Sequence, residues 1–333
     1  MARRKYIQEY ITTGRLTLPV VILLVSLIWL IGSLSPIKGV DSNVFWNKLL
    51  EILQGSFLRN LLGYILLGVA AVQLLILHNT FALIRTHSNF YLTLFILFSG
   101  LLVPQTLDVA SVIVPCVLLT THNLFKTYQM QQPVGYVFQA FLFIGLGSIL
   151  FPPLLYYIPF FYISLINFHT LTWRTFFAGL LGICLPYWGI FAYAIFTENM
   201  TLFYGPFLKL VPTLPICYDG WTLPMILSLS YVLLITLTGS LHCLIYNYED
   251  KIKTRALLSY FIVLQVWTLL LLFGQPQYYS TLFPILITGS CILGGHFFAL
   301  SRTKASNLFF VVCVLLFIAL ISYIIWTYTH NIY

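Results

Sequence analysis

The chain has 333 residues, of which 60% are hydrophobic and only 7% are charged, and its mean hydropathy is +0.95. About a quarter of the residues in soluble domains are charged, so this composition excludes a large soluble catalytic domain, a nucleotide-binding fold and a disulfide scaffold. At about 20 residues per bilayer span, the hydrophobic share would supply about ten transmembrane helices. The sequence therefore predicts an all-α, polytopic transmembrane bundle that forms a single integral membrane domain over residues 1–333.

The net charge of +8 comes from 16 Lys and Arg residues against 8 Asp and Glu residues. In a soluble protein such a balance would favour a nucleic-acid partner. In a chain this apolar, positive charge marks the cytoplasmic loops. We therefore expect membrane lipids, and no nucleic acid, as partners.

Apolar runs bounded by polar residues, glycine or proline predict about eleven spans. They cover residues 18–34, 61–84, 90–103, 109–121, 135–150, 154–168, 175–196, 222–246, 256–274, 280–300 and 306–328. The first run is too long for the apolar region of a secretory signal, so it is expected to remain as an anchor. The short runs at 90–103 and 109–121 would alternatively form one broken hairpin around the turn at 103–108.

The basic residues predict an orientation with the N-terminus inside and, because the number of spans is odd, the C-terminus outside. This orientation places twelve basic residues on the inner side and four on the outer side, as expected for cytoplasmic loops. The inner set is Arg3, Arg4, Lys5, Arg15, Arg85, Lys126, Arg174, Lys251, Lys253, Arg255, Arg302 and Lys304, and the outer set is Lys38, Lys48, Arg59 and Lys209. Five acids face out under the same assignment, namely Asp41, Glu51, Asp108, Glu198 and Asp219.

Two outer loops, 35–60 and 197–221, are longer than a tight turn. In the first, apolar residues at helical spacing predict an amphipathic helix over residues 43–58 that lies flat in the membrane interface. The second is rich in proline and aromatic residues, which favours a folded-back re-entrant cap.

Asp41 and Asp108 are the predicted catalytic residues. Asp41 opens the first outer loop, and Asp108 lies in the tight turn between the third and fourth spans, where an unpartnered charge beside the bilayer is costly. Two such carboxylates would hold a divalent cation with a diphosphate, or one would take a proton from an attacking hydroxyl group. The alternative is that each residue only caps a helix.

The outer cations Lys38, Arg59 and Lys209 would bind a phosphate-bearing substrate, Arg59 best of all because its guanidinium group is a bidentate donor. With the outward-facing acids Glu198 and Asp219 they complete the predicted substrate-binding set. The alternative for Lys209 is a side chain that extends to lipid headgroups. No cofactor is indicated beyond the divalent cation, and no metal-ligand set is assigned.

Six histidines fall at or near predicted inner ends of spans, namely His78, His87, His122, His169, His242 and His296. They would converge on a metal or haem, or simply lie at the membrane–water interface. The motif H-N-x-F occurs at 78–81 and again at 122–125, always at an inner end. It would fit a parallel repeat of one hairpin, or a shared need for polar helix ends.

The segment Phe151-Pro152-Pro153-Leu154-Leu155, followed by Thr172-Trp173-Arg174, Gly182 and Pro186-Tyr187, resembles the middle of an uncharacterised family of polytopic bacterial inner-membrane proteins. This resemblance implies a multi-pass protein of the cell inner (plasma) membrane. Members of the family sometimes carry a carotenoid oxygenase-like label, but this sequence offers no ligand set for that chemistry.

In layout, the chain also resembles the GT-C type lipid-linked glycosyltransferases. In that class an acid in the first outer loop works with acids in the next outer loop, and Asp41 and Asp108 match these acids by position. The first loop, 35–60, is shorter than is usual for that class.

The leading functional prediction is a membrane-embedded transferase that acts at the outer face on a lipid-phosphate-linked substrate, such as a polyprenyl-linked sugar that enters sideways between helices. One alternative is a transporter or lipid flippase, which the repeat and the proline-broken spans favour. Another is a non-catalytic subunit of a cell-envelope membrane complex. A transporter needs a polar pathway at mid-membrane, whereas an outer-face enzyme needs only a cavity at that face.

Overall fold

The structure is a computed structural model that describes residues 6–31, 46–47, 50–51, 53, 55–86, 88–208, 210, 218, 220–246, 248 and 250–330. Within these residues the chain is all-helical and contains no strand. The helices are α1 (Ile7–Thr13), α2 (Thr17–Ile31), α4 (Ser56–Phe81), α5 (Phe90–Leu101), α6 (Val109–Thr127), α7 (Val134–Leu150), η1 (Pro152–Tyr157), α8 (Ile158–Asn167), α9 (Trp173–Phe196), α10 (Thr201–Leu208), α11 (Leu223–Ile245), α12 (Ile252–Gly274), η3 (Pro276–Tyr278), α13 (Tyr279–Leu300) and α14 (Lys304–His330).

Seven segments among the described residues are long and apolar enough to cross a membrane. They are α4, α6, α9, α11, α12, α13 with η3, and α14. The pair α1 and α2, bent by 75°, would make an eighth, whereas α5 and α7 are shorter apolar helices. The predicted all-α fold is therefore confirmed, and the long apolar helices fit a membrane-embedded protein. Each of the eleven predicted runs contains a helix, but the number that crosses the bilayer stays a prediction.

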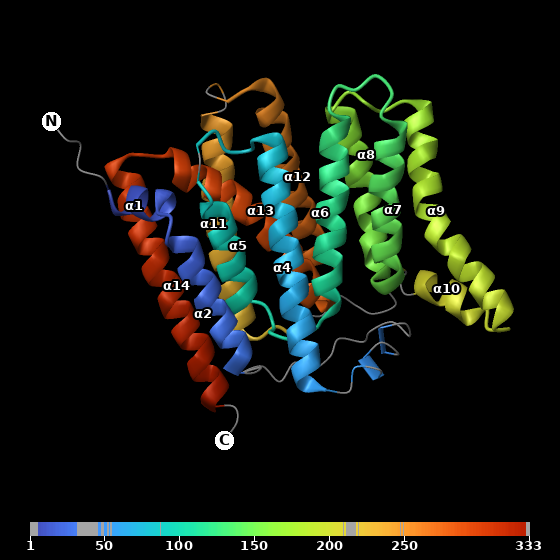
Figure 1. Cartoon of the computed structure of the whole chain (residues 1–333), viewed down its shortest axis with the longest axis horizontal. Helices are drawn as coiled ribbons and strands as arrows, with labels where there is room; N and C mark the ends of the chain where they lie inside the picture. Colours follow the sequence, from blue (N-terminus) through green and yellow to red (C-terminus); the bar gives the residue numbers. More distant parts are fainter. Residues whose placement is uncertain are drawn as a thin grey trace.

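The helices stand side by side and run alternately up and down, as Figure 1 shows. Helix α13 is the centre of the bundle and packs against α5, α6, α11 and α12. In its most apolar stretch 94% of the residues are buried, against 22% in α14. A helix that is apolar on all sides is normally enclosed by other helices, and α13 follows that rule.

Glycines allow the closest helix contacts. A Cβ atom added at Gly239 of α11 would lie 2.6 Å from the backbone of Leu293 in α13, and one at Gly182 of α9 would lie 2.6 Å from the carbonyl oxygen of Phe138 in α7. Small residues at such positions let helix backbones approach, which is how helices associate in membranes. Gly182 belongs to the segment on which the family resemblance rests, and its role in the structure is this packing.

The two H-N-x-F motifs lie side by side at the ends of α4 and α6. The ring centroid of Phe81 is 5.5 Å from that of His122 and 5.4 Å from that of Phe125. The repeated pattern therefore forms one aromatic contact between neighbouring helices.

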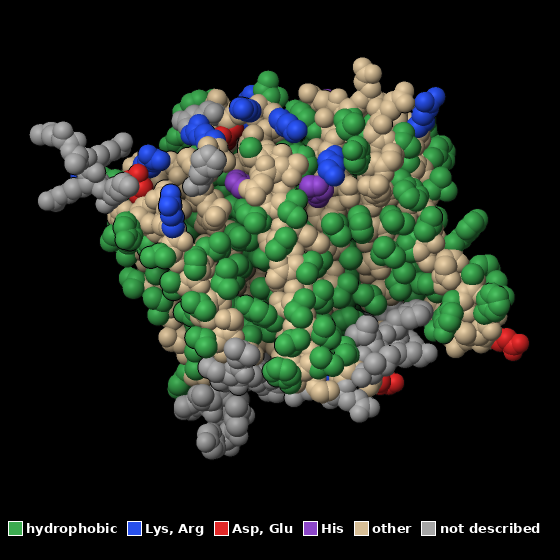
Figure 2. All heavy atoms as spheres, viewed as in Figure 1, with side chains coloured by type: hydrophobic (Ala, Val, Ile, Leu, Met, Phe, Trp, Pro, Cys, Tyr) green, Lys and Arg blue, Asp and Glu red, His purple; other side chains and the backbone are tan. Residues whose placement is uncertain are grey.

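Charges are unevenly distributed, and Figure 2 shows Lys and Arg side chains gathered at one end of the molecule, above a broad hydrophobic band. We call this the basic end. It holds the last turns of α4, α6, α11 and α13 and the first turns of α9, α12 and α14. In the seven long helices of the described chain, every charged residue lies within four positions of a helix end.

The predicted interfacial helix over residues 43–58 is wrong at its C-terminal end. Of the described residues in this range, 46–47 and 50–51 are helical. Gly55 has an extended backbone, with φ −84° and ψ 126°, and α4 begins at Ser56. Phe57 therefore belongs to α4, because the extended glycine interrupts the helical pattern that the apolar spacing suggested.

Candidate functional site

Three of the seven predicted site residues are described by the structure, namely Arg59, Asp108 and Glu198. Asp41, Lys38, Lys209 and Asp219 lie outside the described residues. The predicted distance between the carboxylates of Asp41 and Asp108 therefore stays a prediction.

Asp108 caps α6 at the end of the bundle opposite to the basic end. The backbone N–H of Val109 donates to its Oδ1 atom at 2.7 Å, and the N–H of Asp108 donates to Oγ of Ser111 at 3.4 Å. Because the Asp108 side chain also accepts from the backbone N–H of Ser111, Asp108 and Ser111 form a capping box, which accounts for the position of Asp108 at a helix start. The capping role that the sequence offered as an alternative is therefore present.

Capping uses only one of the two carboxyl oxygens of Asp108. The Oδ2 atom of Asp108 is fully enclosed and has no hydrogen-bond partner among the described residues. Burial raises the pKa of this carboxyl above its usual value, and the hydrogen bond from Val109 only partly offsets that effect. A buried polar atom without a partner is costly in a protein, so a ligand or a water molecule that reached this oxygen would relieve that cost.

An apolar cavity with a volume of about 50 Å³ lies beside Asp108. Its walls come from α2, α4, α5, the turn at 103–108, α6 and α13. None of the described residues that line it is Lys, Arg or His. Pockets that are mostly apolar with a few polar groups are typical of small-molecule sites. This cavity is the candidate functional site.

Trp29 of α2 is a second polar group in the cavity wall, and sequence reasoning missed it. Its side chain is only 7% exposed, and its Nε1 atom is enclosed without an acceptor among the described residues. A Trp near a helix end normally suggests membrane-interface anchoring, so the sequence carries no signal for this role.

Arg59 does not line the cavity. Its Nε atom donates to the carbonyl oxygen of Leu53 at 2.6 Å, and its Nη2 atom donates to that of Leu50 at 3.2 Å. The guanidinium group thus holds the chain that precedes α4. Its predicted contact with a substrate phosphate stays a prediction.

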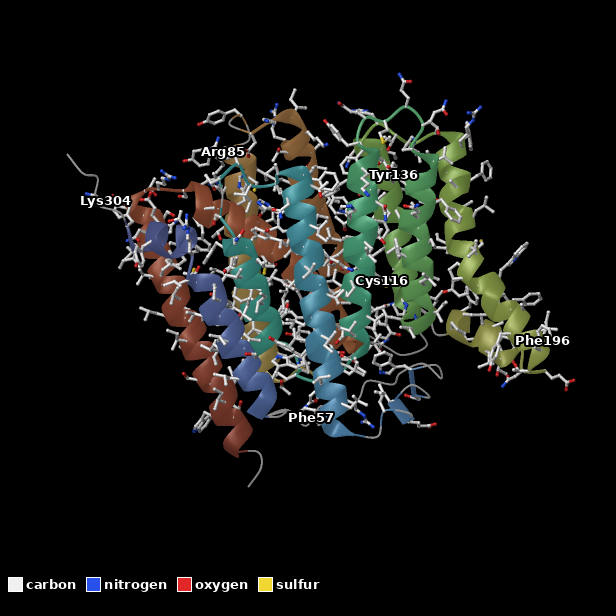
Figure 3. The ribbon with its side chains drawn as sticks, viewed as in Figure 1. Phe57, Arg85, Cys116, Tyr136, Phe196 and Lys304 are labelled. Carbon is white, nitrogen blue, oxygen red and sulfur yellow. The ribbon has the colours of Figure 1, made fainter. Side chains whose placement is uncertain are left out.

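Glu198 lies away from Asp108. It follows the end of α9 in a left-handed conformation, with φ 50°, and its side chain is exposed. Figure 3 places the neighbouring Phe196 at the outer edge of the bundle, on the far side of α7 from α4 and α6. The structure therefore does not bring Glu198 to the cavity.

A second polar cluster lies at the basic end. The Nε2 atom of His296 is 3.1 Å from Oδ2 of Asp250, and its Nδ1 atom is 3.5 Å from the sulfur of Cys243. An ionised carboxylate only accepts hydrogen bonds, so Nε2–H of His296 donates to Asp250, while Nδ1 meets the thiol of Cys243. The sequence placed His296 near an inner helix end but did not predict its contacts with Asp250 and Cys243.

The charges around Asp250 favour its ionised form. Burial alone would raise the pKa of Asp250, but the hydrogen bond from His296 and the charge of that imidazole lower it. The charges of Arg85 and His242 act in the same direction, and the pKa lies below its usual value. Among the described residues no group of three or more His, Cys, Asp or Glu side chains is placed to hold a metal ion. The cluster is therefore a hydrogen-bonded network in this part of the chain.

Comparison of the chain with protein-family models, with curated proteins and with solved structures gives no match. The resemblances noted in the sequence stay predictions.

Proposed function

We propose that the chain crosses a bacterial inner membrane eleven times, with the basic end in the cytoplasm and the Asp108 end outside. The gathering of Lys and Arg at one end supports this orientation, because such residues concentrate in cytoplasmic loops. Beside the seven long helices, the bent pair α1 and α2 would make one crossing, and the short helices α5, α7 and α8, each packed against other helices, would make the other three.

A membrane-impermeant maleimide applied to intact cells tests this topology. In a background without native cysteines, a single cysteine at position 198 should react with the reagent. A single cysteine at position 251 should remain unreactive. Labelling at position 251 in intact cells would contradict the proposed orientation.

We propose further that the protein is a transferase that acts on a lipid-phosphate-linked substrate at the outer face, with Asp108 as the general base. The observation that carries this proposal is the cavity beside the unpartnered Oδ2 atom of Asp108. In the reaction, Asp108 accepts the proton of an attacking hydroxyl group. The hydroxyl oxygen bonds to the transferred group, and the bond to the lipid phosphate breaks, with its electron pair leaving on the phosphate.

Three other predicted site residues, all outside the described part of the chain, keep a role in this proposal. Asp41 would assist Asp108, directly or through a divalent cation, and Lys38 and Lys209 would neutralise the leaving phosphate. The lack of charged residues in the middle of the long described helices favours this function over a transporter, which needs a polar pathway there.

Lipid analysis of cells tests the transferase. A strain without the protein should accumulate a polyprenyl-phosphate-linked lipid, measured by mass spectrometry of lipid extracts. Wild-type protein and the matched control Glu198→Gln should remove it, whereas Asp108→Asn should not, although its protein level is unchanged because Asn caps helices as well as Asp. An unchanged lipid profile in the deletion strain, or full activity of Asp108→Asn, would refute the proposal.

A further inference from the structure

Two residues that line the cavity beside Asp108 each carry an enclosed polar atom without a hydrogen-bond partner among the described residues. The donor is the indole N–H of Trp29, and the acceptor is Oδ2 of Asp108. Both atoms are fully enclosed in the described chain, and both residues line the same cavity from different elements, α2 and the start of α6. An enclosed polar atom normally finds a partner, so two of them at one cavity indicate a ligand that satisfies both.

The remaining walls indicate what the rest of the ligand is like. The lining continues from Asp108 into the bundle along apolar side chains, among them Leu66, Phe95 and Val114. On α4 the lining extends from Gly63 to Ala70, which corresponds to about 10 Å along the helix axis. A site with polar groups at its outer end and apolar side chains deeper in the bundle fits an amphiphile whose head lies at the membrane surface.

The chemistry of the head group follows from the charges. A phosphate would face the Asp108 carboxyl without a cation among the described lining residues, and an ammonium group could not accept a hydrogen bond from Trp29. A hydroxyl group meets both requirements, because it both donates and accepts hydrogen bonds. It donates to Oδ2 of Asp108 and accepts from Nε1 of Trp29.

We infer that this cavity binds the head of a long-chain alcohol, held between the Trp29 indole N–H and the Asp108 carboxyl group. Two sources share that chemistry, an isoprenoid alcohol and the free hydroxyl of a diacylglycerol. The inference rests on the proposed function for its catalytic meaning, since the bound alcohol would be the lipid acceptor that Asp108 deprotonates. Binding of the alcohol is measured without turnover, so the binding inference and the proposed transferase function can be refuted independently.

Photoaffinity labelling of the purified full chain in lipid nanodiscs tests the inference. The probe is a farnesol analogue that carries a diazirine and an alkyne, and unlabelled competitors are farnesol, farnesyl methyl ether, farnesyl phosphate and dioctanoylglycerol. Farnesol or dioctanoylglycerol should compete at concentrations about tenfold lower than the ether, which cannot donate to Asp108. The better of these two alcohols identifies the source.

Variants locate the binding site. Trp29→Phe removes only the N–H donor and should weaken competition by the alcohol about tenfold, whereas the methyl ether stays a weak competitor. Ala70→Phe fills the cavity and should abolish labelling, whereas Val69→Phe, on the exposed side of α4, should leave it unchanged. Any of three results would overturn the inference and leave water as the partner of both atoms. These are equal competition by alcohol and ether on the wild-type protein, preference for the phosphate, and labelling that survives Ala70→Phe.

Discussion

His296 and Asp250 form a buried pair between α13 and the loop that joins α11 to α12, with 3.1 Å between Nε2 and Oδ2 and side chains only 1% and 4% exposed. The same end of the molecule has an exposed ion pair for comparison, Arg302 with Glu9, at 3.7 Å. Burial decides how much such pairs matter, because losing one partner of a buried pair leaves the other without compensation.

We expect Asp250→Ala to lower the free energy of unfolding by about 1.5–3 kcal/mol, the usual contribution of a hydrogen bond to a charged group. Glu9→Ala is the matched control and should cost at most about 1 kcal/mol, because its pair is exposed to solvent. Thermal unfolding of the detergent-solubilised variants measures both. Equal losses for the two variants would mean that the Asp250 pair contributes no more than a surface contact.

Acidification should remove the contribution of Asp250. Because its pKa is lowered in the folded protein, this contribution is complete above the unfolded pKa of about 4 and is lost as the pH falls through the folded pKa. Wild-type protein should therefore lose more thermal stability than Asp250→Asn when the pH is lowered from about 5 to about 3. Parallel pH profiles for the two proteins would contradict the assignment.

Asp108 should show the opposite dependence. Burial raises its folded pKa, so its contribution to stability is complete below the unfolded pKa and is lost as the pH rises through the folded pKa. Between about pH 4 and pH 7, wild-type protein should lose stability relative to Asp108→Asn, which keeps the cap without the charge. Asp108→Ala separates the two effects, since it should cost about 1 kcal/mol through loss of the cap.

Two glycines of α9 should respond in opposite ways to alanine. At Gly182 the new Cβ atom would lie 2.6 Å from a backbone oxygen of α7, so Gly182→Ala should separate the helices and cost about 1–3 kcal/mol. At Gly189 nothing lies within 4 Å, and Gly189→Ala should stabilise the helix by about 0.4–1 kcal/mol. Thermal unfolding of the pair gives the comparison, and similar losses at both positions would disprove the close α7–α9 contact.

The sequence predicted the helices well because long apolar runs leave few other structures possible in a bilayer. The starts of α6 and α9 were readable as well, since Asp108 and Thr172 carry the side-chain oxygens that cap a first turn. The central position of α13 could not be predicted from the sequence. It is no more apolar than α9, and its burial depends on glycines such as Gly294, which contacts Ile235 of α11.

The candidate site was predictable only in part. Asp108 was identified as a cap and as a candidate acid, and both descriptions follow from its place in a tight turn beside the bilayer. The cavity and the role of Trp29 depend on how α2, α4, α5 and α6 meet, which no local pattern records. Arg59 was expected to bind phosphate, but its hydrogen bonds go to backbone carbonyl groups that the sequence does not distinguish.

The contacts of Gln8 in α1 constrain how the protein is made. Its side-chain amide donates to the carbonyl oxygens of Phe298 and Ser301, at 2.7 and 2.8 Å, and accepts from the hydroxyl of Ser306 at 2.8 Å. Chains are synthesised from the N-terminus, so α1 waits for partners that leave the ribosome almost 300 residues later. Folding therefore ends when α1 packs against the end of α13 and the start of α14. If translation stops before α13 is made, the nascent chain lacks the helix at the centre of the bundle.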